Sequence, residues 1–173
     1  MKRLFFALWP DDGVRARLAE QARLLPINMG RRVPPENFHI TLVFLGNVEE
    51  QDIPRLADDA AALKTPGFPL QIDHCGWWKR AKVVWLAPAH APEPLLELVK
   101  QINRLSRLAG LPVDERDYSP HLTIARKLTQ PVKPCTYDPI HWDVREFCLV
   151  ESVTHEKGAR YRVLRSWRLG SEC

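Results

Sequence analysis

The sequence predicts an α+β protein in which two similar αβ lobes form a single domain. Segments with the two-residue period of strands alternate with segments of helical spacing along the whole chain. The pattern His-x-Thr followed by an aliphatic residue occurs twice, at His39 and at His121, each time where a strand pattern begins. No low-complexity segment or long linker separates the halves, so we expect residues 1–173 to form one bilobal domain.

The elements of the first half follow from apolar spacing and from turn residues. Residues 3–9 have the composition of a buried strand, and Pro10-Asp11-Asp12 then offers a helix start. A loop rich in turn formers precedes a β-branched and aromatic run that ends at Gly46-Asn47. Pro54 is an irregularity inside the second helical segment. The expected elements are a strand at 3–9, a helix at 11–25, a strand at 38–45 and a helix at 49–64.

The second half repeats this alternation and ends in strands. The clearest helix lies over residues 91–110, with an apolar face that runs from Leu95 to Leu108, and Gly110 ends it. Residues 131–139 are rich in proline and predict a loop. The expected strands are two hairpin strands at 68–76 and 82–87, a short strand at 121–126, and two further hairpin strands at 143–154 and 160–169.

Composition and charge indicate an ordinary globular protein with a mild preference for anionic partners. The chain has 173 residues, of which 45% are hydrophobic and 27% charged, and this composition excludes a disordered chain. Its net charge of +4 favours anionic partners but does not by itself identify nucleic acid. The four cysteines match no zinc spacing, and we expect reduced thiols at Cys75, Cys135, Cys148 and Cys173.

The chain begins with an apolar run that is too short for a secretion signal. The run from Leu4 to Trp9 ends at a Pro-Asp-Asp turn and has no small-residue cleavage site after it. No run approaches the roughly 18 apolar residues of a membrane helix. We therefore expect a cytoplasmic protein that does not act at a membrane.

The two His-x-Thr motifs place matched polar side chains on single strand faces. Because strand side chains alternate, His39 shares a face with Thr41, and His121 shares a face with Thr123. Six histidines and six threonines would produce only about 0.2 such pairs by chance in a chain of this length. One motif alone is readily explained by a histidine that is hydrogen-bonded in the core. Two matched motifs instead indicate two polar pairs that face one cleft.

Two histidines across a cleft can divide general acid and general base catalysis between them. A neutral imidazole accepts a proton near neutral pH, while a charged imidazole donates one. The threonine hydroxyls of both motifs can donate to anionic oxygens, so the four side chains would hold a phosphate. The motifs contain no carboxylate for a divalent metal, and the chain has no Gly-x-x-x-x-Gly-Lys loop for a nucleoside triphosphate.

Arg126 follows His121 by five positions and is a candidate phosphate ligand. Its forked guanidinium donors would stabilise a pentacoordinate phosphorus better than a lysine could. Strict alternation places Arg126 on the strand face opposite His121. Arg126 therefore reaches the phosphate only if the strand bulges or ends near Ala125, and otherwise it is a surface residue.

Five segments of the chain resemble the 2H phosphoesterases, and in particular the RNA 2′,3′-cyclic phosphodiesterases, also called 2′-5′ RNA ligases. The segments are RLFFALWPDD, VPPENFHITLVFLG, KVVWLAP, SPHLTIAR and RYRVLRSWRL. The resemblance implies the bilobal 2H phosphoesterase fold, in which two pseudo-symmetric αβ lobes with antiparallel sheets surround a central cleft. It also implies hydrolysis of RNA 2′,3′-cyclic phosphate ends to 2′-phosphomonoesters, with 2′-5′ RNA ligation as the reverse reaction and with no metal or other cofactor.

The resemblance also assigns roles to the motif residues. It makes His39 the proton donor to the leaving 3′-oxygen and His121 the proton acceptor from the attacking water. It makes Thr41 and Thr123 ligands of the nonbridging oxygens, supported by Arg126. The implied partner is RNA with a 2′,3′-cyclic phosphate end, tRNA-derived ends among them. We expect a monomer, because the cleft lies within one chain.

Base recognition is less sharply indicated than phosphate chemistry. Phe5 is the candidate for stacking on the terminal base, although core packing is the commoner fate of such a residue. Further candidate stackers are Trp77, Trp78 and Trp85. Basic side chains that could guide the RNA backbone, unless they are only solvated loop charges, are Arg31, Arg32, Lys79, Arg80 and Lys82.

Three other functions fit the same residues. A non-catalytic RNA-binding module would bind a cyclic phosphate end without forming product. A cyclic phosphodiesterase acting on a small nucleotide, such as a cyclic ADP-ribose phosphate, would prefer a mononucleotide to an oligonucleotide. A zinc hydrolase with the metal on His39 and His121 would lose its activity to a chelator.

Overall fold

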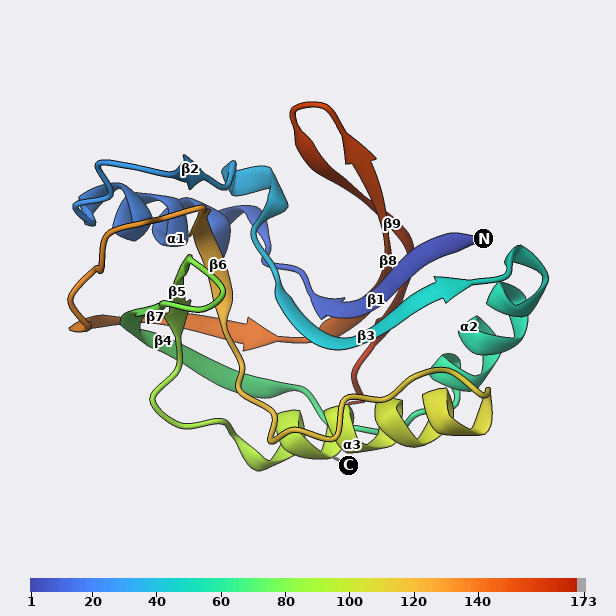
Figure 1. Ribbon diagram of the computed structural model, residues 1–173. Coiled ribbons are helices and arrows are strands. Elements are labelled where there is room, and N and C mark those ends of the chain that lie inside the picture. The colour runs from blue at the N-terminus through green and yellow to red at the C-terminus, as the bar shows by residue number, and fades with distance from the viewer. Residues whose placement is uncertain (171–173) are drawn as a thin grey trace.

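The computed structural model describes residues 1–170, which contain three α-helices and nine β-strands (Figure 1). The helices are α1 (Asp12–Leu24), α2 (Ile53–Ala61) and α3 (Glu93–Leu108). The strands are β1 (Lys2–Leu8), β2 (Arg31–Arg32), β3 (Ile40–Val48), β4 (Phe68–Trp78), β5 (Val83–Ala87), β6 (Leu122–Arg126), β7 (Cys135–Val144), β8 (Glu146–His155) and β9 (Gly158–Arg168). Short 3₁₀ turns are η1 (Pro35–Asn37) and η2 (Glu50–Asp52). Within this part of the chain, no helix is both long and apolar enough to cross a bilayer.

The strands form one antiparallel sheet that divides into two halves. One half has the order β3-β1-β8-β9, and the other has the order β6-β5-β4-β7. The halves meet where β3 pairs with β6 through Ile40 and Leu122, the residues that directly follow the two motif histidines. The two residues of β2 pair with β6 beside this junction. The predicted α+β class with antiparallel sheets is confirmed.

The two halves repeat one strand–helix–strand unit. In the first lobe β1 leads through α1 to β3, and in the second lobe β5 leads through α3 to β6. The two strands of each unit pair with one another in antiparallel fashion. Each unit therefore ends in a strand that continues from a motif histidine. These units are the two pseudo-symmetric lobes that the repeated motif predicted.

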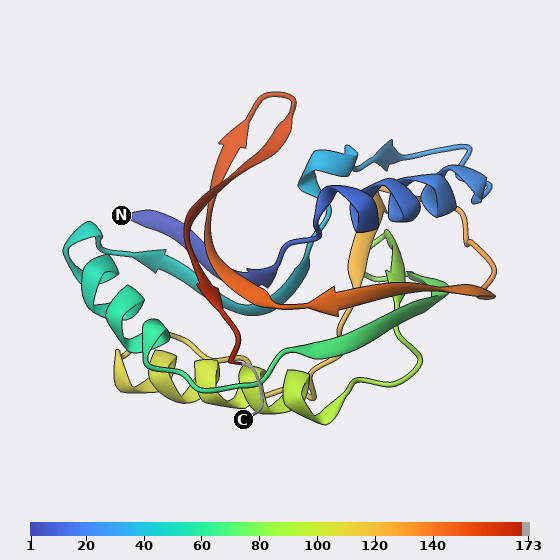
Figure 2. The ribbon, with the colours of Figure 1, turned by 180° about the vertical axis from the view of Figure 1, so that it is seen from behind.

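The helices bury the apolar faces that the spacing predicted, and α1 and α3 each pack against a strand of the other lobe. Asp11 begins α1 by accepting a hydrogen bond from the backbone N–H of Val14 at 2.8 Å. The buried residues of α3 are Leu95, Leu98, Val99, Ile102, Leu105 and Ser106. Leu108 was expected on this face but is 76% exposed, because the chain leaves the helix there through Gly110 at φ +74°. Packing of α1 on β7 and of α3 on β3 interlocks the lobes (Figures 1 and 2).

Three elements differ from the sequence predictions. α2 begins at Ile53, so Pro54 lies in its first turn, where the missing N–H breaks no helical hydrogen bond. Residues 131–139 were predicted as a loop, yet β7 begins within them at Cys135. β7 is an edge strand of the sheet, and its register with β4 is irregular around Pro139, which makes the proline tolerable. β2 was not predicted, because two residues are too few to show a period.

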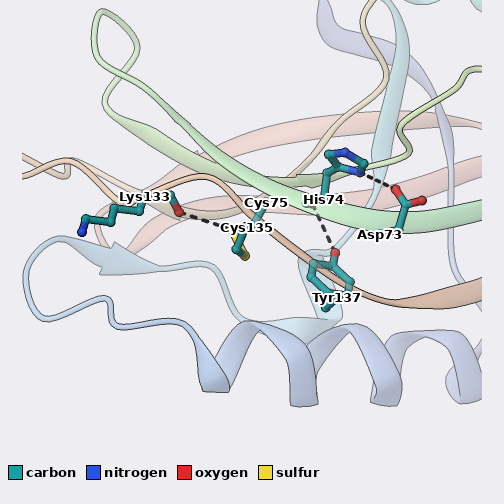
Figure 3. Close-up of a disulfide and its surroundings, with 6 residues drawn as sticks. All are labelled: Asp73, His74, Cys75, Lys133, Cys135 and Tyr137. Carbon is teal, nitrogen blue, oxygen red and sulfur yellow. Dashed lines mark hydrogen bonds and ion pairs between the residues drawn. A yellow bond between two sulfur atoms is a disulfide. The ribbon is translucent and has the colours of Figure 1, made fainter.

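The position of β7 also corrects the expectation for two cysteines. Pairing of β4 with β7 sets Cys75 opposite Cys135 with their Cα atoms 5.1 Å apart, and the two form a disulfide (Figure 3). Beside it, the Tyr137 hydroxyl donates to the carbonyl of His74 at 3.2 Å and bridges the irregular register. The prediction of reduced thiols is therefore wrong for this pair. Cys148 is a free, buried thiol, and Cys173 lies outside the described residues.

Candidate active site

A cavity of about 1150 Å³ is lined by residues of both lobes and by the end of the β8–β9 hairpin. All six residues predicted for the site line it, namely Phe5, His39, Thr41, His121, Thr123 and Arg126. The hairpin projects from the sheet (Figure 1), and we call its outer part, residues 152–161, the arm. The sequence motifs, 82 positions apart, thus meet at one site because β3 and β6 are neighbours in the sheet.

Both motif histidines are held by the same local hydrogen bond. Nδ1 of His39 lies 2.7 Å from the carbonyl oxygen of Asn37, and Nδ1 of His121 lies 2.8 Å from that of Ser119. A carbonyl oxygen only accepts, so Nδ1 carries the hydrogen in each ring and donates it. Each ring is thereby fixed in orientation and in tautomer. Nε2 of each histidine remains available to gain or lose a proton.

Each motif strand bulges at the fourth residue of its motif. On β3, Thr41 pairs with Ala7 and Val43 with Phe6, which leaves Leu42 as an extra residue. On β6, Thr123 pairs with Trp85 and Ala125 with Val84, which leaves Ile124 as the extra residue. In both strands two consecutive side chains are buried at this point, instead of the alternation of a regular strand.

The bulges return the fifth residue after each histidine to the cavity. In the second lobe this residue is Arg126, so the strand meets the condition on which its role depended. In the first lobe the equivalent residue is Phe44, which also lines the cavity and is 59% exposed. The repeat therefore places a cation in one lobe and an exposed aromatic ring in the other.

His39 is enclosed by three aromatic rings. Trp9 stacks on its imidazole with centroids 5.2 Å apart and an interplanar angle of 5°. Phe5 and Tyr161 contact it at centroid distances of 5.0 Å each. Burial among these rings lowers the pKa of His39 from 6.5 to about 4, against the opposing effect of the hydrogen bond to Asn37. The positive charge of Arg126 lowers this pKa further.

His121 has a more open environment with a single aromatic neighbour. Trp78 meets its ring edge-on, with centroids 4.5 Å apart. Burial again lowers the pKa of His121, the hydrogen bond to Ser119 opposes the change, and Arg126 adds to it. The Arg126 guanidinium thus lowers the pKa of both histidines, and Arg126 lines the same cavity as both.

The structure distinguishes among the aromatic residues proposed for stacking. Phe5 is only 2% exposed and lies against Phe44, with ring centroids 5.7 Å apart, so it supports the ring that faces the cavity. Trp85 lies opposite Gly76 and packs over it, which leaves no room for a side chain there. Trp77 does not line the cavity, whereas Trp78 does.

Several residues of the site were missed in the sequence. Trp9 and Tyr161 lie outside the motifs, and no local pattern links them to His39. Phe44 was detectable, since it follows His39 by the same five positions that separate Arg126 from His121. Tyr118 donates its hydroxyl to the carbonyl of Thr41 at 3.0 Å and so ties the segment before one motif to the backbone of the other.

The arrangement offers two proton-transfer nitrogens, two hydroxyls and one guanidinium to a single bound group. These are donors for an anionic, tetrahedral or pentacoordinate centre. Within residues 1–170, no cluster of three or more histidine, cysteine, aspartate or glutamate side chains is placed to hold a metal ion.

The profile of the 2′-5′ RNA ligase superfamily matches residues 10–156 of the chain. The chain belongs to this superfamily. It is 32% identical to the RNA 2′,3′-cyclic phosphodiesterase of Escherichia coli, over 97% of each chain. It is 33% identical to the RNA 2′,3′-cyclic phosphodiesterase of Thermus thermophilus, over 98% of this chain and 91% of that one. The crystal structure of E. coli LigT complexed with 3′-AMP superposes with a TM-score of 0.87 at 31% identity, over 97% of this chain and 98% of that one. These comparisons confirm the 2H phosphoesterase fold that the resemblance implied.

Proposed function

We propose that the protein hydrolyses the 2′,3′-cyclic phosphate end of RNA to a 2′-phosphomonoester, with no metal or other cofactor. One observation carries this proposal. Two histidines, each held through Nδ1, leave their Nε2 atoms available at one cavity that Arg126 also lines. The activity for which the two superfamily relatives are named supports the choice of substrate.

In the proposed reaction each histidine moves one proton through Nε2. Neutral His121 takes a proton from water as the water oxygen attacks phosphorus. The bond from phosphorus to the 3′-oxygen breaks, and charged His39 gives its Nε2 proton to that oxygen. The products are a 2′-phosphomonoester and a free 3′-hydroxyl, with His121 protonated and His39 neutral. Proton exchange with solvent then returns both histidines to their starting protonation states.

The surroundings of His39 suit it to the role of acid. Its lowered pKa, about 4, makes the imidazolium a strong proton donor once it is formed. A bound phosphodiester carries a negative charge, which favours the imidazolium and raises the pKa of His39 in the complex. The stacked Trp9 ring also stabilises the charged imidazole and holds its direction.

The remaining residues bind the phosphate and the base. The hydroxyls of Thr41 and Thr123 donate to the nonbridging oxygens, and Arg126 stabilises the charge that grows on them in the transition state. Phe44 presents its exposed ring to the terminal base, supported from behind by Phe5. Phe44 thus takes the stacking role that the sequence suggested for Phe5.

The same site would catalyse 2′-5′ ligation when an RNA 5′-hydroxyl end replaces water as the attacking group. His121 then takes the proton of the 5′-hydroxyl, His39 again protonates the leaving 3′-oxygen, and the RNA product is a 2′-5′ linked strand. In water, hydrolysis dominates unless two RNA ends are held together. We propose that the protein acts on its RNA as a monomer, because the cavity is formed within one chain. We also propose that it acts in the cytoplasm, where RNA is available as its substrate.

The test is product analysis on a short RNA with a 2′,3′-cyclic phosphate end, in the presence of a chelator. We expect a 2′-phosphate product from the wild type, and none from His39→Ala or His121→Ala. A 3′-phosphate product would mean that the other ring oxygen leaves. Binding of the RNA without turnover would replace the enzyme with a binding module, and inhibition by the chelator would indicate a metal enzyme.

A further inference from the structure

The cavity is more basic and larger than one cyclic phosphate requires. Seven arginines and lysines line it against two glutamates, Glu36 and Glu156. The cations are Arg3, Arg31, Arg32, Arg126, Lys127, Lys157 and Arg160. None of the seven takes part in an ion pair within residues 1–170. The volume of about 1150 Å³ also exceeds the roughly 300–1000 Å³ typical of pockets for single small ligands.

One of these cations already has a structural partner. The guanidinium of Arg32 donates to the carbonyls of Ala22 and Leu25 at 2.8 and 3.1 Å. These are carbonyls at the C-terminal end of α1, where a positive charge is favourable. Arg32 therefore stabilises the helix end, and its charge needs no ligand.

Arg31, by contrast, lies in an unfavourable position unless an anion is present. It pairs directly with Arg126 across β2 and β6, so the two side chains project from the same face of the sheet. Like charges at directly opposed positions destabilise a sheet. A bound anion beside Arg31 removes this repulsion. β2 and β3 pair with the same edge of β6, since β5 occupies the other edge, and Arg31 lies beside the end of β6 that is away from the junction at Leu122.

Lys127 is a second cation that the fold alone does not explain. Its backbone has φ +58°, a left-handed conformation that is strained for an L-residue and that glycine adopts freely. A protein with lysine at this position is therefore less stable than one with glycine. Lys127 lines the cavity, as does the preceding residue, Arg126. Lys82 has the same left-handed backbone, at φ +55°, but does not line the cavity.

The arm brings two further cations to the same place. A methyl group at Gly158 would come within 2.9 Å of Nη2 of Arg31, so the tip of the arm packs on this guanidinium. Asn37 donates its side-chain N–H to the carbonyl of Ala159 at 3.2 Å and closes the contact. Lys157 and Arg160 flank this tip and line the cavity.

We propose that Arg31 and Lys127, with Lys157 and Arg160 of the arm, form a second phosphate subsite, which takes the phosphodiester that precedes the cyclic end. This proposal rests on the proposed function. A 2′,3′-cyclic phosphate closes the 3′ end of an RNA, so the strand continues only through the 5′-oxygen of the same nucleoside. Its next phosphate is the one anion that must lie near a cyclic phosphate held by Arg126. The substrate class is therefore an oligonucleotide, and a cyclic mononucleotide leaves the subsite empty.

The test compares two substrates on the same variants. The substrates are a nucleoside 2′,3′-cyclic monophosphate and a trinucleotide that ends in the same cyclic nucleotide. We expect Arg31→Gln combined with Lys127→Gln to raise KM for the trinucleotide about tenfold or more, with a far smaller change for the mononucleotide. The slope of log affinity against log salt should fall by about 0.7 for the lost phosphate contact. The matched control is Arg165→Gln with Arg168→Gln, which removes the same charge from β9 outside the cavity.

A pair of glycine variants separates binding from folding. Lys127→Gly relieves the left-handed backbone, so its melting temperature should not fall below that of the wild type, while its affinity for the trinucleotide decreases. Lys82→Gly relieves the same conformation outside the cavity and should bind the trinucleotide as the wild type does. Fluorescence anisotropy with a 3′-phosphorylated trinucleotide measures this affinity without turnover.

The outcomes distinguish this proposal from the one on which it rests. Loss confined to the trinucleotide supports the second subsite. Equal loss for both substrates, or loss in the Arg165 and Arg168 control, overturns it and leaves only a general electrostatic attraction. If neither substrate is turned over by the wild type, the proposed function fails, and the anisotropy data alone decide whether the subsite binds a phosphodiester.

Discussion

The two lobes share one motif, one hydrogen-bond tether and one bulge, yet their histidines have different surroundings. His39 lies among Phe5, Trp9 and Tyr161, whereas His121 contacts the edge of Trp78 alone. The fifth residue after each histidine is an exposed phenylalanine in one lobe and an arginine in the other. The comparison shows how a repeated unit becomes asymmetric. The repeat sets the positions of the histidines, and residues outside the motif give each histidine a different environment. Under the proposed mechanism, these environments decide which histidine is the acid and which is the base.

The largest expected effect is the loss of either histidine. His39→Ala and His121→Ala should each lower kcat by about 10²–10⁴-fold, because each removes one proton transfer. The double variant should lose less than the product of the two single losses, since the two transfers belong to one step. Steady-state kinetics on an RNA with a cyclic phosphate end measures all three. Loss in only one of the single variants would mean that the lobes do not share the chemistry.

The next effect is the dependence of kcat/KM on pH. In the proposed mechanism the active free enzyme carries one proton on the histidine pair, and the pKa values of both His39 and His121 are lowered below 6.5. The optimum should therefore lie below pH 6.5, and kcat/KM should fall about tenfold per pH unit on the alkaline side as the required proton is lost.

Arg126 provides the internal control for this profile. Its charge contributes to the lowered pKa of both histidines. Arg126→Gln should therefore move the alkaline limb of kcat/KM to higher pH, even as the rate at the optimum falls. If the alkaline limb of kcat/KM lies at the same pH in Arg126→Gln as in the wild type, Arg126 is too distant from the histidines to act with them.

A third comparison tests the two equivalent positions after the bulges. Arg126→Gln should lower kcat by roughly 10–100-fold, because the guanidinium stabilises charge that grows in the transition state. Phe44→Ala should mainly raise KM, by roughly 5–150-fold, since a stacked base is worth about 1–3 kcal/mol in the ground state and in the transition state alike. Steady-state kinetics on one RNA separates the two. The same pattern of kcat and KM in both variants would contradict the assigned asymmetry.

The smallest effect concerns the tie between the lobes. Tyr118→Phe removes the hydroxyl that donates to the carbonyl of Thr41 and leaves that carbonyl without this donor. We expect a loss of about 1 kcal/mol in the free energy of unfolding and a fall of a few fold in kcat, because the two motifs lose part of their mutual register. Chemical denaturation and kinetics measure the two losses. Unchanged kcat with reduced stability would make the tie structural only.

Much of the fold was predictable because its signals are local. The β-branched and aromatic run of β3 and the apolar face of α3 are both readable in short windows. The position of β7 was not predictable. Pro139 argues against a strand in general, and only the order of the strands shows that β7 lies at the edge of the sheet, where a proline is tolerated. The disulfide between Cys75 and Cys135 depends on that same strand and was missed with it.

The candidate site shows a similar division. The motif histidines and threonines are recognisable because strand alternation places each pair on one face. Arg126 required a bulge, which depends on pairing with β5 and leaves no clear mark in the sequence. The aromatic enclosure of His39 draws on Trp9 and Tyr161, which are brought together only by the sheet order and the arm. Such long-range contacts have no local pattern.

The division of roles between the histidines can be tested directly with an activated leaving group. The substrate is a 3′-deoxynucleoside 2′-(4-nitrophenyl phosphate), in which water attacks phosphorus and nitrophenolate leaves without needing a proton. Release of nitrophenolate by the wild type, by His39→Ala and by His121→Ala is followed by absorbance. If His39 is the acid, His39→Ala should hydrolyse this substrate nearly as fast as the wild type, while His121→Ala remains inactive. Activity retained by His121→Ala and lost in His39→Ala would reverse the two roles and contradict the account.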